Sequence, residues 1–178
     1  MTSHAEVPRL ELPPGMASER PESQLAAFTR FCESSTGREL AAPAAMQAFS
    51  VADFRRFWSL FLDWSALLCH GAPQPVCTDD RCEDAIFFPH LMLNYAENLL
   101  RIDSPEAGAR TALVAHHAFR PPTRLSRAEL RERVLAVASH LRRMGVGPGD
   151  RVAAMAGNDA EAVVAGLATA AVGATFSC

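Results

Sequence analysis

An uncharged, apolar segment at the end of the chain constrains the fold more than any other feature. No residue from 162 to 178 is charged. This segment is rich in Ala and Gly, is slightly shorter than the ~20 residues that a membrane span needs, and is interrupted by Gly173. We therefore expect a buried helix over residues 159–172 and a buried strand over 174–178, and no membrane segment.

A second strand, predicted over residues 151–156, precedes this helix and completes a strand–helix–strand pattern. Such a pattern over about thirty residues is typical of a βαβ unit in a parallel sheet, whose strands are usually buried on both faces. Asn158 is expected to cap the helix, with Asp159 and Glu161 in its first turn. The last strand would need further neighbours, so we expect the sheet to be incomplete within these 178 residues.

The segment before this unit carries clear signals for a hairpin and a helix. Residues 111–115 and 123–125 are predicted to pair as strands across a Pro-Pro corner. Ser126 and Glu129 have the spacing of a capping box at the start of a helix, and Gly145 stands where that helix should end. Gly147 and Gly149 then form a turn into the next strand.

Helical periodicity dominates the first hundred residues. We predict a helix over 22–33, a second helix that begins at Ser50 as N-cap, and a short helix over 93–100. Residues 1–20 are polar and rich in proline, and are expected to be a disordered leader without a signal peptide. An aromatic stripe at helical spacing is expected to lie in the core: Phe54, Phe57, Trp58 and Phe61.

Composition limits the chemistry of these residues. The net charge is −3, which argues against a nucleic-acid partner, and all 17 basic residues are arginines. Without lysine, these residues cannot form a Schiff base, a Walker-type phosphate loop or a catalytic ammonium group. Five cysteines without a dense framework favour the reducing cytoplasm.

One cluster has the residue types of a metal site. Cys77 and Cys82, flanked by His70 and His90, could in principle bind zinc, but their spacing is poor and ordinary thiols are the favoured interpretation. The role of the two cysteines stays open. The acidic segment 79–84 is expected to be a solvated loop and not a pair of catalytic carboxylates.

The remaining candidates also have plain structural explanations. The glycines of 145–149 precede a strand instead of opening a helix, so their amides are not presented to a phosphate. Asp159 and Glu161 place negative charge where an anion would bind at the next helix. His116, His117 and His140 lack ligand partners at suitable spacing and are expected at the surface. We therefore assign no catalytic, cofactor-binding or metal residue.

Three segments of the first hundred residues carry a further signal: the aromatic segment 57–65, Phe-Phe-Pro at 87–89 and Leu-Asn-Tyr-Ala-Glu-Asn-Leu-Leu at 93–100. Together they resemble acetoacetate–CoA ligases, within the superfamily of adenylate-forming acyl-CoA synthetases. Residues 144–152 and 172–177 resemble the opening of the superfamily's large domain. The 93–100 motif is the most specific, and the resemblance runs from about residue 25 to residue 178.

This resemblance implies an α/β fold with three parts. A disordered leader (1–20) precedes a helical N-terminal extension (21–105), and residues 106–178 form the first, incomplete βαβ portion of the AMP-binding large domain. The family activates an acid with ATP and Mg²⁺ to an acyl-adenylate and transfers the acyl group to coenzyme A. Its phosphate loop and catalytic lysine have no counterpart here, so the chain alone is expected to be inactive and to bind none of these cofactors.

Two interpretations of function remain open. In the first, the chain is the N-terminal part of such a ligase, and its partner is the remainder of the ligase, from the same or a separate gene. In the second, it is a non-catalytic interaction module that binds a partner or a complementing ligase chain. Neither involves nucleic acid or a membrane.

Overall fold

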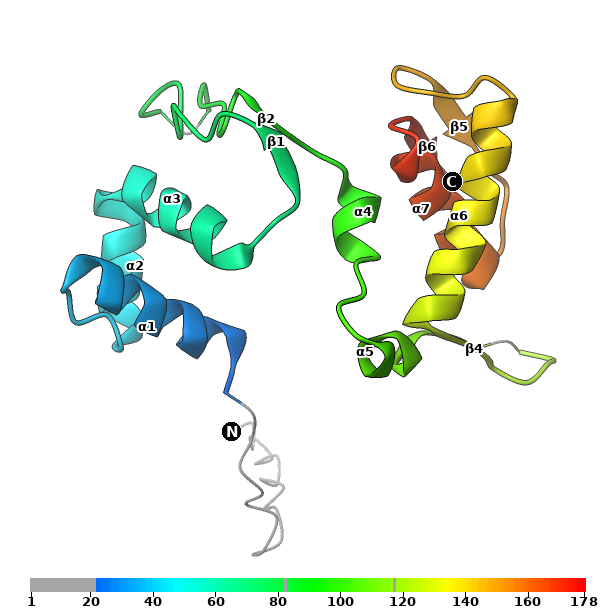
Figure 1. The fold of residues 1–178 in the computed structure, drawn as a ribbon, viewed down its shortest axis with the longest axis horizontal. Helices are drawn as coiled ribbons and strands as arrows, with labels where there is room; N and C mark the ends of the chain where they lie inside the picture. The colour runs from blue at the N-terminus through cyan, green and yellow to red at the C-terminus, as the bar shows by residue number, and fades with distance from the viewer. Residues whose placement is uncertain (1–21, 82, 117) are drawn as a thin grey trace, which may run out of the picture. The chain divides into compact units, whose positions relative to one another are not determined.

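A computed structural model describes residues 22–81, 83–116 and 118–178. The predicted leader, Cys82 and His117 lie outside the described residues. The chain divides into two compact units, Met1–Trp64 and Ser65–Cys178 (Figure 1). The first unit is helical, and the second combines helices with three two-stranded sheets. This mixed architecture confirms the predicted α/β class.

Three helices form the described part of the first unit: α1 (Gln24–Thr36), α2 (Pro43–Ala52) and α3 (Phe54–Ser65). Ser23 caps α1, and Gly37 ends it in the left-handed conformation with φ 68°. The prediction that Ser50 caps a helix was wrong, because Ser50 lies inside α2. Pro43 begins that helix, where its missing N–H costs nothing, and Asp53 separates it from α3.

The core of the first unit contains five buried residues, with aromatic rings packed around them. The buried set is Phe28, Cys32, Leu40, Phe49 and Leu60. Phe57 and Phe61 pack against this set edge to face with Phe28, at ring-centroid distances of 5.5 and 5.6 Å. The expectation that the aromatic stripe lies in the core was wrong for Trp58, which is 37% exposed, whereas Leu60 of the same helix is 2% exposed.

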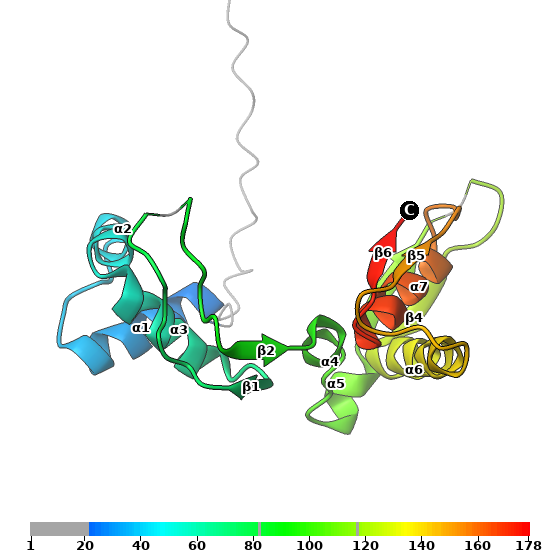
Figure 2. The same ribbon diagram turned by 90° about the horizontal axis from the view of Figure 1, so that it is seen from above.

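The second unit begins with an antiparallel arm, in which β1 (Cys69–Gly71) pairs with β2 (Leu91–Leu93). Two short helices follow, α4 (Tyr95–Leu99) and α5 (Pro105–Ala109). The predicted helix over 93–100 exists but is shorter, since Leu93 belongs to β2 and Asn94 is the N-cap of α4. Both ribbon views place α4 between the arm and the α6–α7 pair described next (Figure 2).

The predicted hairpin and helix after it are confirmed. β3 (Thr111–Ala115) pairs antiparallel with β4 (Thr123–Ser126), and α6 (Arg127–Arg143) follows directly. The Ser126 hydroxyl accepts a hydrogen bond from the Glu129 amide at 3.2 Å, and the Glu129 carboxylate accepts one from the Ser126 amide at 2.8 Å. Gly145 follows the end of α6 with φ 83°. The capping box and the glycine therefore set both ends of α6.

The βαβ pattern at the end of the chain is also confirmed. β5 (Arg151–Ala153) and β6 (Thr175–Ser177) are parallel and are joined by α7 (Ala160–Ala171). Asp159, and not Asn158, is the N-cap of α7, since its carboxylate accepts the Glu161 amide.

The two strands are shorter than predicted and are not buried on both faces. Val152 and Phe176 are half-buried, whereas their neighbours along each strand are exposed. α7 lies close to β6. A Cβ atom added at Gly166 of α7 would lie only 3.2 Å from the Phe176 ring of β6. The buried part of this unit therefore lies mainly between α6 and α7 and not around the two strands.

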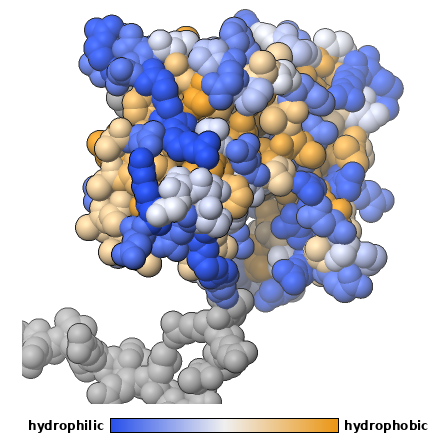
Figure 3. All heavy atoms as spheres, turned by 60° about the vertical axis from the view of Figure 1, so that its left-hand side comes forward, coloured by the Kyte–Doolittle hydropathy of each residue, from blue (hydrophilic) through white to orange (hydrophobic). Residues whose placement is uncertain are grey.

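Hydrophobic residues are visible between hydrophilic ones on the face drawn in Figure 3. Large exposed residues of this kind include Met92, Tyr95 and Leu135, at 77%, 63% and 54% exposure. None of the helices in the described ranges is long and apolar enough to cross a membrane.

Candidate functional site

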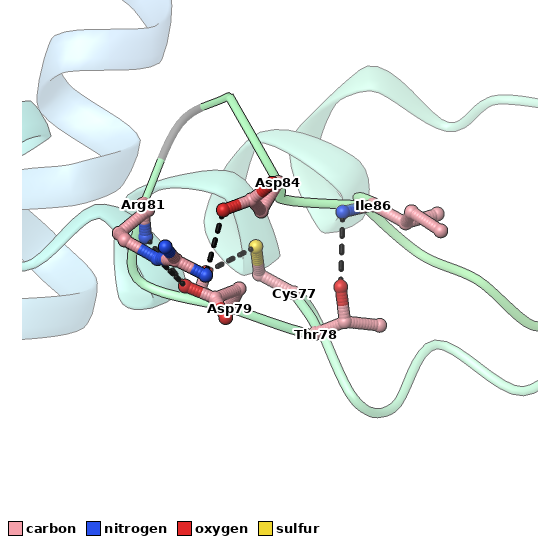
Figure 4. Close-up of polar contacts among 6 residues, drawn as sticks. All are labelled: Cys77, Thr78, Asp79, Arg81, Asp84 and Ile86. Carbon is pink, nitrogen blue, oxygen red and sulfur yellow. Dashed lines mark hydrogen bonds and ion pairs between the residues drawn. The ribbon is translucent and has the colours of Figure 1, made fainter.

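The loop that holds Cys77 is closed by its own hydrogen bonds (Figure 4). The Cys77 thiol donates to the Asp79 carbonyl at 3.0 Å, and the Ile86 amide donates to the Thr78 hydroxyl at 3.0 Å. Arg81 pairs with Asp84 at 2.6 Å and with Asp79 at 3.4 Å. These carboxylates are therefore engaged by an exposed arginine, which confirms an acidic loop at the surface.

The zinc hypothesis for this loop is tested only in part, because Cys82 lies outside the described residues. Over residues 22–81, 83–116 and 118–178, no three His, Cys, Asp or Glu side chains are grouped so that they could hold a metal ion. Cys77 is buried, whereas His70 and His90 are exposed. The three described candidates are thus not drawn into a common ligand set.

The glycine-rich segment and the N-terminus of α7 are both satisfied internally. The Gly147 amide donates to the Asp150 carboxylate at 2.9 Å, which fixes a turn before β5. Asp159 accepts Arg120 at 3.2 Å in addition to its capping bond. His116 and His140 are exposed, as expected. None of these groups presents a free set of donors to a phosphate.

The residues around helix α4 bond to several parts of the second unit. Asn94 caps α4 itself and also bonds to the end of α7. Its Oδ1 accepts the Glu97 amide at 3.1 Å and so caps α4. Its Nδ2 donates to the carbonyls of Ala170 and Ala171, at 3.3 and 3.1 Å, in the last turn of α7. One half-buried amide therefore bonds to the start of α4 and to the end of α7, where its acceptors lie 76 and 77 positions further along the chain.

The second asparagine of the 93–100 motif holds the arm. The Asn98 side chain accepts the Leu68 amide at 2.8 Å and donates to the Leu68 carbonyl at 2.9 Å, like a paired strand. Arg101 donates to the Ala66 carbonyl at 3.1 Å. Arg127 of α6 in turn donates to the Arg101 carbonyl at 2.9 Å. The motif and the adjoining Arg101 thus connect the segment before β1, α6 and α7, which gives these residues a structural role.

Among the described residues, three ionisable groups have shifted pKa values, and none of the three lies in a reactive cluster. Hydrogen bonds from the Ser126 backbone and hydroxyl lower the pKa of Glu129. The backbone amide of Glu106 and the Ser104 hydroxyl lower the pKa of Glu106 in the same way. Burial raises the pKa of the Cys32 thiol, which keeps it protonated in the core of the first unit. All three shifts belong to helix starts or packing.

A groove of about 730 Å³ runs along the side of α6 that faces α4. Its floor is apolar and includes Ala96, Leu100 and Ala138, while Leu68 and Leu135 stand on its walls. Arg131 and Arg142 of α6 and Glu97 of α4 also line it. None of these residues was predicted from the sequence to form a binding site. The signal was present in the helical spacing of Arg131, Leu135, Ser139 and Arg142, which places them on one face of α6.

A family model and a solved structure of another protein both match this chain. Residues 103–178 match the model of the AMP-binding enzyme family. Acetoacetyl-CoA synthetase from Streptomyces lividans has a solved structure that superimposes with a TM-score of 0.76 at 34% identity, over 85% of this chain. The fold is therefore that of the N-terminal part of an adenylate-forming enzyme.

The sequence relatives point to one group within that class. Acetoacetyl-coenzyme A synthetase of Rhizobium meliloti is 37% identical over 155 residues, or 87% of this chain, and the rat acetoacetyl-CoA synthetase is 36% identical over 132 residues, or 72%. The resemblance of this chain to the N-terminal portion of acetoacetyl-CoA synthetases is thus confirmed. The chain spans 23% of the length of the Rhizobium relative and 19% of the rat one.

Proposed function

We propose that this chain is the N-terminal portion of an acid–CoA ligase that acts on a short-chain acid such as acetoacetate. The observation that carries the proposal is the match to the Streptomyces lividans synthetase over 85% of the chain. The whole enzyme would form an acyl-adenylate from ATP and the acid with Mg²⁺, and would then transfer the acyl group to coenzyme A. Its working compartment would be the cytoplasm.

Within that enzyme, we assign a structural role to the residues of this chain. Residues 21–105 would form the helical extension and 106–178 the opening of the large domain. The carboxylates of Asp84, Asp150 and Asp159 are engaged in an ion pair, a turn and a helix cap, so these groups are not free to hold Mg²⁺. The groups that perform the chemistry would therefore be supplied by the remainder of the ligase, which is the partner in this proposal.

A chimera tests the family assignment and the role together. Residues 1–178 would replace the matching N-terminal segment of the Rhizobium meliloti synthetase, and acetoacetate-dependent ATP–pyrophosphate exchange would be measured. We expect exchange from the chimera and none from residues 1–178 alone. Acetate and butyrate, tested in parallel, would show whether the acid preference follows acetoacetate.

Two results would contradict the proposal. Exchange by residues 1–178 alone would overturn the structural role. A chimera that folds like its parent but shows no exchange with any of the three acids would overturn the ligase assignment. In the second case, cooperative unfolding of the isolated chain as a soluble monomer would favour the interaction module.

A further inference from the structure

The groove along α6 is a hollow in the surface of the second unit. Helices α4, α6 and α7 meet beneath it. Its floor is formed by Ala96 and Leu100 of α4, Ala138 of α6 and Ala171 of α7. Ala96 is fully buried and Ala138 is 5% exposed, so the floor is continuous with the main core of the unit. A volume of about 730 Å³ lies in the range of sites that hold small molecules, roughly 300–1,000 Å³.

The walls of the groove expose apolar side chains that the core does not use. Leu135 is 54% exposed and Leu68 is 39% exposed, and they lie on α6 and on the segment before β1. Covering such side chains with an apolar body would be favourable by about 25 cal/mol for each Å² removed from water. The groove therefore favours a ligand with an apolar body.

The positive charge on the α6 side of the groove favours a negatively charged ligand. Arg131 and Arg142 both line the groove, and no other residue of the described ranges forms an ion pair or side-chain hydrogen bond with either guanidinium. They are eleven positions apart, about 16 Å along the helix, with Leu135 and Ser139 between them. By contrast, the third arginine of the groove, Arg101, is paired with Asp103 at 2.7 Å. Two cations are thus available on one wall.

The α4 side of the groove adds a constraint on orientation. Glu97, which lines the groove, belongs to α4 and not to α6. A carboxylate there repels a second anion and accepts a hydrogen bond from a donor. A ligand would therefore direct its anionic group to α6 and an apolar or hydrogen-bond-donating edge to α4.

We propose that this groove binds a small amphipathic anion, whose apolar body covers Leu135 and Leu68 and whose charged group pairs with Arg131 or Arg142. This site lies outside the chemistry assigned above to the remainder of the ligase, and the proposal does not depend on the acid that the ligase would activate.

The test uses an anilinonaphthalene sulfonate dye, an apolar anion whose fluorescence rises on binding. We expect saturable binding by the purified chain. Arg131→Gln and Arg142→Gln should each raise the dissociation constant about threefold, and the double variant about tenfold. Leu135→Glu should raise it about tenfold. Arg133→Gln is the matched control, because it removes the same charge from the same helix but does not line the groove.

Competition with eight-carbon compounds separates the contribution of charge from that of apolar contact. Octanoate should displace the dye, whereas octanol should displace it weakly and octylammonium least. Equal displacement by all three, or unchanged dye binding in the double arginine variant with a native circular-dichroism spectrum, would overturn the proposal. Loss of specific dye binding in the chimera would show that the remainder of the enzyme covers the groove, and would also overturn it.

Discussion

The two compact units are stabilised in different ways. In the first, a few large rings do most of the packing: Phe28 contacts Phe57, Phe61 and Trp64 at centroid distances of 5.1 to 5.6 Å. In the second, the buried set contains small and aliphatic residues and no aromatic ring, and side chains such as Asn94 bond to backbone groups far away in the chain. The stability of the first unit thus comes mainly from the packing of aromatic rings. The stability of the second unit comes also from hydrogen bonds between polar side chains and backbone groups at helix ends.

This difference affects how each unit tolerates substitution. An aromatic cluster at the rim of a core can lose a ring at moderate cost, because the site is already open to water. A side chain that satisfies two helix ends at once cannot be removed without leaving several backbone groups unpaired. The following predictions test this contrast, from the largest expected effect to the smallest.

The largest effect should come from deleting the central aliphatic residue of either unit. Leu60→Ala and Leu125→Ala should each lower the free energy of unfolding by about 3 kcal/mol, since both side chains are 2% exposed. Both tryptophans, Trp58 and Trp64, belong to the first unit, so tryptophan fluorescence in urea reports that unit alone. Only Leu60→Ala should shift the fluorescence transition. An equal shift in both variants would mean that the two units unfold together.

Removal of the Asn94 side chain should cost about 2 kcal/mol, because the Glu97 amide loses its acceptor and the Ala171 carbonyl loses its donor. Circular dichroism of urea unfolding measures this effect in the second unit. Asn94→Asp separates the two roles, since a carboxylate still caps α4 but cannot donate to the α7 carbonyls. If Asn94→Asp were as stable as the native chain, the bonds to α7 would contribute nothing.

Trp58→Ala should cost about 1.5 kcal/mol, which is less than Leu60→Ala, because the ring is 37% exposed and packs in T-shaped geometry with Phe57 and Phe61. The sequence pattern alone favoured a core position, for which roughly 3–5 kcal/mol is usual. The urea midpoint decides between the two values. A loss at the upper value would show that the ring is buried in solution.

The smallest effect concerns the capping box of α6. Ser126→Ala should cost about 1 kcal/mol. Glu129→Gln should lower the melting temperature at neutral pH. Because folding lowers the pKa of Glu129, its charge stabilises the fold above the usual pKa of a glutamate, and this contribution is lost as the pH falls through the folded value. The difference between the native chain and Glu129→Gln should therefore disappear in acid, and a difference that persists there would contradict the electrostatic explanation.

The ends of helices were predicted from the sequence more accurately in the second unit than in the first. In the second unit, Ser126, Glu129, Gly145 and Gly173 act through local chemistry, so the ends of α6 and the order of the βαβ unit could be read directly. Asn158 was the exception, since its neighbour Asp159 has the same capping chemistry and receives Arg120 as well. Such a choice between adjacent caps depends on a residue 39 positions away.

In the first unit, the same local rules were less informative. Ser50 has the chemistry of a cap, yet Pro43 had already started a helix that passes through it. Helical spacing showed that the aromatic residues share one side of α3, but not that Leu60 would lie at the centre of the interface. The groove of the second unit was also hidden, because its walls come from segments that meet only in the folded chain.

The connection between Asn94 and the end of α7 sets an order for folding during synthesis. α4 has five residues, too few for a helix to be stable alone in water. Its N-cap residue is made early, but the carbonyls that receive its amide belong to residues 170 and 171, which are synthesised last in this stretch. The connection between α4 and α7 can therefore form only after α7 has emerged, so α4 lacks this support until residues 170 and 171 have been synthesised.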